Sequence, residues 1–105
     1  MGKKMYKLLI ADDEYWTREK IRSMIAWEEY QIAFMPPAQD GEEVLQILEA
    51  DRPDILITDI NMPFLNGVEL VKRVKDQYPE MKGYLMRYKS QNMGESDFFD
   101  LLSLD

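Results

Sequence analysis

Apolar and polar residues form alternating blocks along this chain, and the blocks predict strands and helices in turn. Residues 6–11 and 55–58 are continuous apolar runs, which is typical of strands buried on both faces of a parallel sheet. A shorter run at 31–35 ends before Pro36 and Pro37, which suits a strand at a sheet edge. Each run precedes a segment whose apolar residues have helical spacing, and these predicted helices cover residues 15–26, 42–50 and 67–78.

The repeated strand–helix units predict an α/β fold. Crossovers with short links make neighbouring strands parallel and place helices on both faces of the sheet. The chain has 105 residues, which is enough for one domain and not for two. We therefore expect a single domain over residues 1–105, in which residues 1–5 are a polar lead.

The first predicted helix has two different faces. Asp13 precedes it and is expected to cap it, because a carboxylate can accept a free N–H group of the first turn. Trp16 and Trp27 are expected to pack against other side chains rather than to bind a partner. The face expected to meet the sheet holds Thr17, Ile21, Met24 and Ile25, and the opposite face holds Arg18, Glu19 and Arg22.

The pattern weakens toward the C-terminal end. Residues 83–86 predict a fourth strand, although Gly83 is unfavourable in a strand. Ser96 is expected to cap a short helix over residues 97–104, and no fifth strand is expected. The segment 96–104 has two interpretations: a terminal helix that covers the open sheet edge, or an acidic and apolar peptide that docks on a partner or on another copy of this chain.

Composition and charge exclude several classes of protein. Hydrophobic residues make up 46% of the chain, so a core can form. The net charge of -7 argues against a nucleic-acid surface, which needs clustered Lys and Arg. The absence of Cys and His excludes disulfides, thiolate metal sites, catalytic triads and imidazole acid–base chemistry. Because no apolar run has the length of a membrane span, we expect a soluble, cytoplasmic protein.

Acidic residues follow two of the predicted strands. Asp12 and Asp13 come after residues 6–11, and Asp59 closes the apolar run of the third strand. The carboxyl ends of parallel strands meet at one edge of a sheet, where ligands bind. Three carboxylates there repel one another, and Mg2+ relieves this with oxygen ligands at roughly 2.0–2.1 Å. The main-chain carbonyl of Asn61 could join them, and a carboxylate beside the ion could attack a phosphoryl group.

The acidic pair has a simpler interpretation when it is taken alone. Asp12 and Asp13 would then be a solvated loop and a helix cap. Their combination with Asp59, Asn61 and Pro63 at a strand end favours the metal site.

These motifs resemble a known family. Residues 9–14 and 53–63, with Asn66 and Gly67, resemble the receiver domain of bacterial two-component response regulators. The resemblance covers residues 6–82. The segment Trp27-Glu28-Glu29 is similar to the subgroup whose receiver precedes an AraC-type DNA-binding domain, and such an output domain is absent from this chain.

The resemblance implies a fold and a set of roles. The fold is a flavodoxin-like, doubly wound parallel sheet with strand order 2-1-3-4-5. Asp59 is the phosphoacceptor, which takes a phosphoryl group from a phosphohistidine of a sensor histidine kinase. Asp13, Asp59 and the Asn61 carbonyl contact Mg2+ directly, whereas Asp12 acts through water. DNA would be bound only through the absent output domain.

The tail departs from the family pattern. Receivers carry a Ser or Thr at the end of strand four, and Arg87 stands at that position here. They also carry a Lys followed by Pro at the end of strand five, whereas residues 100–105 contain no Lys and Lys89 lies at the wrong place. Residues 83–105 are therefore expected to be a divergent tail in which the fifth strand and the last helices are missing or replaced.

Two other functions compete with a phosphoacceptor. A receiver-like binding module would keep the acidic metal pocket without completing the phosphorylation switch, as Arg87 and the missing Lys suggest. A haloacid-dehalogenase-type phosphatase would need a second Asp two residues after Asp59, where Asn61 stands. We expect no enzymatic activity on other substrates. An uncovered fourth strand would be hidden by a homodimer or a domain swap.

Overall fold

The computed structural model of the protein describes residues 4–60, 62, 65–89 and 98–103. Strands and helices alternate along most of this length, as the sequence pattern predicts. In chain order the elements are β1 (Tyr6–Ala11), α1 (Tyr15–Met24), a 3-10 turn η1 (Trp27–Tyr30), β2 (Ile32–Phe34), α2 (Gly41–Ala50), β3 (Ile55–Asp59), α3 (Gly67–Gln77), β4 (Lys82–Lys89) and β5 (Phe98–Ser103).

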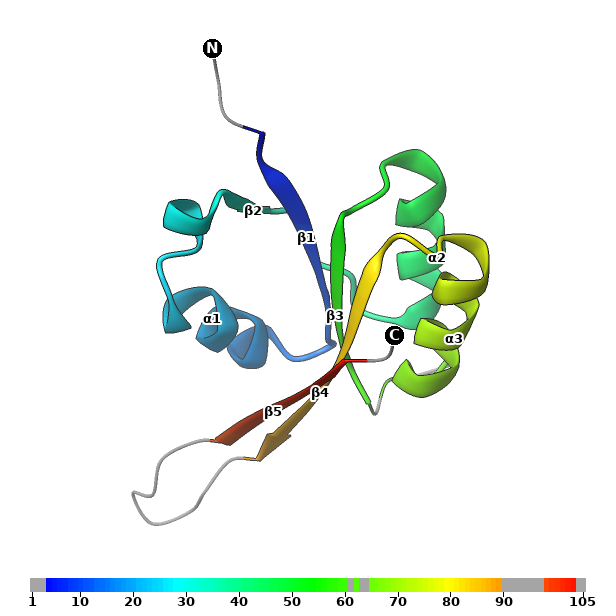
Figure 1. The fold of residues 1–105 in the computed structure, drawn as a ribbon. Coiled ribbons are helices and arrows are strands. Elements are labelled where there is room, and N and C mark those ends of the chain that lie inside the picture. Colours follow the sequence, from blue (N-terminus) through cyan, green and yellow to red (C-terminus); the bar gives the residue numbers. More distant parts are fainter. Residues whose placement is uncertain (1–3, 61, 63–64, 90–97, 104–105) are drawn as a thin grey trace.

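The strands form one sheet in the order β2-β1-β3-β4-β5. The pairs β1–β2, β1–β3 and β3–β4 are all parallel. Helix α1 covers one face of the sheet, and α2 with α3 covers the other (Figure 1). The flavodoxin-like order 2-1-3-4 expected from the sequence is confirmed.

The core lies in two layers because successive residues of a strand point to opposite faces. Leu8 and Ile10 of β1 pack with Ile21 of α1 and with Ile57 of β3. The intervening residues of β1 turn to the other face, where they meet α2 and α3. That larger cluster contains Leu9, Ala11, Ala38, Val44, Leu48, Leu56, Leu65, Leu70, Val74 and Met81. Both faces of β1 and β3 are therefore buried, which explains their continuous apolar runs.

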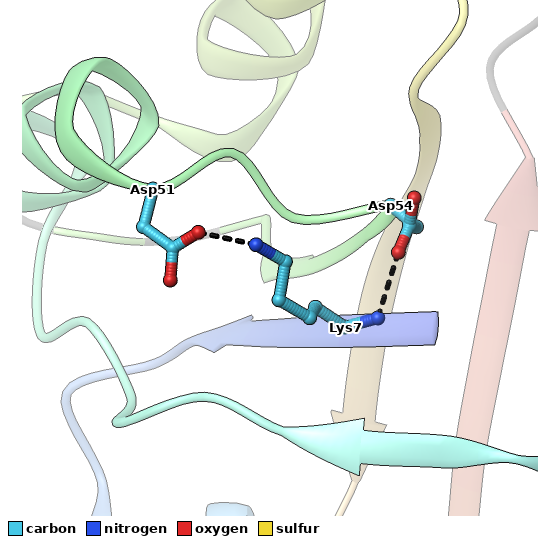
Figure 2. Close-up of polar contacts among 3 residues, drawn as sticks. All are labelled: Lys7, Asp51 and Asp54. Atoms are coloured by element: carbon cyan, nitrogen blue, oxygen red, sulfur yellow. Dashed lines mark hydrogen bonds and ion pairs between the residues drawn. The ribbon is translucent and has the colours of Figure 1, made fainter. Parts of the chain in front are cut away.

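The register of β3 on β1 is fixed at the end of the sheet where both strands begin (Figure 2). The main-chain N–H of Lys7 donates to Oδ2 of Asp54 at 2.8 Å, and the Asp54 N–H donates to the Lys7 carbonyl at 2.9 Å. The Lys7 ammonium also pairs with Asp51, although an exposed ion pair of this kind stabilises little. These contacts set which residues of the two strands lie side by side at the opposite end.

The helices begin with different caps. Asp40 and Asn66 accept N–H groups of α2 and α3 at 2.8 and 2.9 Å. Helix α1 has Glu14 at its N-cap position and no side-chain cap, so the expected cap by Asp13 is wrong. The neighbouring Asp12 carboxylate accepts the Glu14 N–H instead. Within the residues that the structure describes, no helix has both the length and the apolar content needed to cross a membrane.

The packing of α1 differs from the expectation at both ends. Thr17 and Ile21 are buried as predicted, whereas Met24 and Ile25 are exposed, because the helix ends at Met24 and Ile25 has an extended backbone. Trp16 is 79% exposed, so its expected packing role is wrong. Trp27 does pack: its ring lies edge-on to Phe34, and its Nε1–H donates to the Ile21 carbonyl.

The tail forms a hairpin with the fourth strand. Strand β4 is longer than predicted, and β5 pairs with it in the antiparallel sense from Lys89 opposite Phe98 to Tyr84 opposite Ser103. The helix expected over residues 97–104 is therefore wrong for residues 98–103, where pairing with the preceding strand overrides the local preference. The expected Ser96 cap lies outside the described residues. A fifth strand exists, but it replaces the parallel strand of the family pattern.

Candidate functional site

Three acidic side chains meet at the carboxyl edge of the sheet. Asp12 and Asp13 follow β1 directly, and Asp59 is the last residue of β3. One carboxylate oxygen from each residue can be chosen so that all three lie within 4.8 Å of one another. The strand register explains this meeting, because Ala11 lies opposite Thr58 and the next residue along each strand is acidic. The structure thus brings together the three carboxylates that the sequence pattern singled out.

Asp12 is held firmly in place. Its side chain is 2% exposed, and its Oδ1 accepts the Glu14 N–H at 2.8 Å. Its own N–H donates to the Ala38 carbonyl at 2.9 Å, which ties the end of β1 to the loop after β2. Its carbonyl oxygen accepts a hydrogen bond from Nη1 of Arg18 at 2.7 Å. Asp13, the next residue, is exposed.

Gly67 allows α3 to begin directly against Asp59. A Cβ atom at Gly67 would overlap the Asp59 carbonyl oxygen and lie 3.1 Å from Cα of Ile60. The Gly67 N–H donates to the Ile60 carbonyl at 3.0 Å, so the backbone after β3 folds back onto the helix start. The expected role of Gly67 in close packing is confirmed, and this packing fixes the backbone that carries Asp59.

Burial and neighbouring charges raise the pKa of the Asp12 carboxyl to about 7. Burial is the largest cause, because it penalises the charged form. The hydrogen bond from the Glu14 N–H opposes this, while the charges of Asp59, Asp13 and Glu14 raise the pKa further. Near neutral pH, the site therefore favours a protonated Asp12 over three ionised carboxylates.

A family model for the response regulator receiver domain matches residues 8–100 of the chain. The match contains all of the strands except the ends of β1 and β5, and all three acidic residues. The chain belongs to the response regulator receiver domain family.

Two curated relatives agree with this assignment. An uncharacterized response regulatory protein of Staphylococcus epidermidis is 42% identical over 72 residues, which cover 69% of this receiver domain and 29% of that protein. The transcriptional regulatory protein HptR of Staphylococcus aureus is 39% identical over 70 residues, which cover 67% and 28% of the two chains. The matched part of this receiver domain covers less than a third of the length of either relative.

Solved structures show the same fold. The receiver domain of AraT, a response regulator from Geobacillus stearothermophilus, has a TM-score of 0.71 at 37% identity, covering 77% of this receiver domain and 63% of that chain. A two-component transcriptional regulator AraC from Clostridium phytofermentans has a TM-score of 0.66 at 32% identity, covering 83% and 70%. The expected likeness to receivers of AraC-type regulators is therefore confirmed.

The donor set of this receiver domain fits a hard divalent cation. Asp12, Asp13 and Asp59 offer only oxygen ligands, and the chain contains no His or Cys to favour zinc or copper. A cation would also offset the repulsion that helps to raise the pKa of Asp12. Asn61 and Pro63, which the sequence motif adds to the site, lie outside the described residues.

Arg18 belongs to this site, although the sequence pattern placed it on the outer face of the first helix. Its guanidinium reaches back to the main chain of Asp12, six residues earlier. A helical period alone cannot reveal such a contact, because it depends on how the loop before the helix turns. Arg87 in β4, which the sequence pattern placed at the family's switch position, directly follows Met86, the residue paired with Asp59.

The receiver domain has a separate cavity at the opposite end of its sheet. It measures about 770 Å³ and contains none of the three acidic residues. It lies near the contacts of Lys7 that fix the strand register. The side chains that form its aromatic walls are Tyr6, Tyr30 and Tyr78. The acidic edge, rather than this cavity, holds the groups suited to phosphoryl chemistry.

Proposed function

We propose that this receiver domain accepts a phosphoryl group onto Asp59 from a phosphohistidine of a sensor histidine kinase, in a reaction that requires Mg2+. The observation that supports the proposal best is the convergence of the Asp12, Asp13 and Asp59 carboxylates within 4.8 Å of one another. The cluster lies at the carboxyl ends of neighbouring parallel strands, and this kind of sheet binds its ligands at that edge.

In the proposed reaction, a carboxylate oxygen of Asp59 attacks the phosphorus atom. A new oxygen–phosphorus bond forms, the nitrogen–phosphorus bond of the phosphohistidine breaks, and the leaving imidazole takes a proton from water. Asp59 becomes an acyl phosphate. Little covalent chemistry is asked of the protein, so positioning and charge compensation contribute most of the acceleration.

The remaining site residues would hold the metal. Asp13, Asp59 and the Asn61 main-chain carbonyl would bind Mg2+ directly, and Asp12 would hold it through water. The ion would supply positive charge beside the transferred phosphoryl oxygens. Asp12 suits its role because its main chain and carboxylate are fixed by three hydrogen bonds.

The output of the switch would lie outside this chain. The relatives it matches are more than twice as long as this chain, and one of them is named a transcriptional regulatory protein. We therefore propose that the receiver controls an attached DNA-binding domain in the cytoplasm, and that DNA is bound by that domain alone. The chain would have no enzymatic role beyond assisting its own phosphorylation. Homodimerisation or a domain swap stays a prediction, although β5 pairs with the edge of β4 that was expected to be uncovered.

One competing function has support of its own. A receiver-like module that keeps the metal pocket without completing the switch would suit the chain's departures from the family pattern. Arg87 follows the residue paired with Asp59, at the position where receivers carry a Ser or Thr. The antiparallel strand β5 contains no Lys to pair with phosphoryl oxygens.

An assay with a small phosphodonor distinguishes the phosphoacceptor from the competing binding module. The chain is incubated with acetyl phosphate and Mg2+, and the reaction is quenched with acid. The mass of the intact chain is then measured by mass spectrometry. We expect the mass of one phosphoryl group to be gained, to survive acid and to be lost in base. Removal of Mg2+ with a chelator should prevent the gain. Saturable Mg2+ binding without any mass gain would support the competing module and contradict the phosphoacceptor.

A further inference from the structure

Arg18 joins helix α1 to the loop that carries two of the acidic residues. Its side chain is half-buried, and its Nη1 donates a hydrogen bond of 2.7 Å to the main-chain carbonyl oxygen of Asp12. Its own N–H donates to the Glu14 carbonyl at 3.3 Å, in the first turn of the helix. Its guanidinium also lies 5.9 Å from the centre of the Tyr15 ring, which limits where the side chain can go.

The accepting oxygen belongs to the peptide group that joins Asp12 to Asp13. A peptide group is planar, so a hydrogen bond to its oxygen restrains the orientation of the whole plane. Asp12 has two further restraints, from the Ala38 carbonyl and the Glu14 N–H. Within the part of the chain that the structure describes, no side-chain hydrogen bond restrains the exposed Asp13. The direction of its side chain therefore depends on that peptide plane.

We propose that Arg18 is a positioning residue that orients Asp13 for binding Mg2+. This inference rests on the proposed function, because it assigns Asp13 to the metal. Arg18 would not touch the ion or the phosphoryl group. It would act through the Asp12–Asp13 peptide, in the way that outer-shell partners orient metal ligands in other sites.

The positive charge of Arg18 has the opposite effect on metal affinity. A guanidinium beside a cation site repels the cation, so its removal by itself would tighten Mg2+ binding. Solvent and salt screen this repulsion, because the side chain is only half-buried. Loss of ligand orientation should weaken binding more than loss of the charge strengthens it. The direction of the change in affinity therefore tells the positioning role from a purely electrostatic one.

The test is a Mg2+ titration of the labelled chain, followed through the backbone amide signals of residues 12–14 by NMR. Arg18→Met keeps the apolar stem and removes both the donor and the charge. We expect it to weaken Mg2+ binding about tenfold, as losing an outer-shell partner commonly does. Arg18→Lys keeps the charge and a donor group of shorter reach, so its affinity should lie between those of the parent and Arg18→Met.

Arg22→Met provides the matched control. Arg22 lies one turn further along α1, is exposed, and contacts Glu19 and Phe34 rather than the acidic loop. Its replacement should leave Mg2+ affinity within about twofold of the parent, since it has no contact with the metal ligands. The amide spectra also show whether each variant is folded, so a change in stability is not mistaken for a change in affinity.

The outcomes separate this inference from the proposed function. Equal or tighter Mg2+ binding by folded Arg18→Met, with saturable binding by the parent, would overturn the positioning role and leave the proposed function intact. A parent chain whose amides show no saturable response to Mg2+ would overturn both.

Discussion

Replacing Asp59 by asparagine is expected to abolish phosphorylation of the chain by acetyl phosphate. An amide is a poor nucleophile, so the attacking group is lost. Asn has nearly the same size and shape, and Asp59 is only half-buried at the end of β3, so the fold should persist. The acid-stable, base-labile mass gain should disappear, and circular dichroism should show an unchanged spectrum.

Asp76→Asn is the matched control for this experiment. Asp76 is an exposed acid on α3, and it is not one of the three clustered carboxylates. It has the same chemistry as Asp59 without the metal-binding neighbours, so this variant should gain the phosphoryl mass at the parent rate. A full mass gain in Asp59→Asn would show that another residue is the acceptor and would refute the assignment of Asp59.

The second large effect concerns the stability of the metal-free chain. The pKa of Asp12 is raised to about 7 in the folded state, so the folded chain keeps a proton that the unfolded chain releases. The free energy of unfolding must then fall as the pH rises from about 4 to about 7. Each unit of pKa shift corresponds to roughly 1.4 kcal/mol, so Asp12 should reduce stability by on the order of 3 kcal/mol across this range.

Asp12→Asn isolates this contribution. The Asn side-chain oxygen can still accept the Glu14 N–H, but it cannot ionise. Urea unfolding in the presence of a chelator should give similar stabilities for parent and variant near pH 4. The variant should be more stable by on the order of 3 kcal/mol near neutral pH. A constant difference between the two proteins at all pH values would show that the pKa of Asp12 is the same in the folded and unfolded chains, which would contradict the raised pKa.

Much of the fold follows from the sequence, because its strongest signals are local. The runs at β1 and β3 are continuous because both strands are buried on two faces, and buried parallel strands require this pattern. Short strand–helix links dictate parallel order, which brings the ends of these strands to one edge. The meeting of Asp12, Asp13 and Asp59 needs only these facts, so it could be predicted without coordinates.

The features that the sequence could not predict depend on which segments pair or on loop geometry. Strand β5 forms by pairing with β4, although its residues also have the spacing of a short helix. The Glu14 N–H takes Asp12 rather than Asp13 as its acceptor, which depends on how the loop turns after β1. The same turn brings the Asp12 carbonyl to Arg18, and a helical pattern carries no signal for that contact.

The central claim is that Asp59 accepts a phosphoryl group in a pocket completed by Mg2+, and beryllium fluoride tests it most directly. Trifluoroberyllate binds a carboxylate oxygen with the shape of a phosphoryl group and does not depend on a kinase. Fluorine NMR of the chain with beryllium fluoride and Mg2+ should show bound signals that are absent without Mg2+ and absent in Asp59→Asn. A folded parent chain that shows no bound signal at saturating Mg2+ would contradict the account.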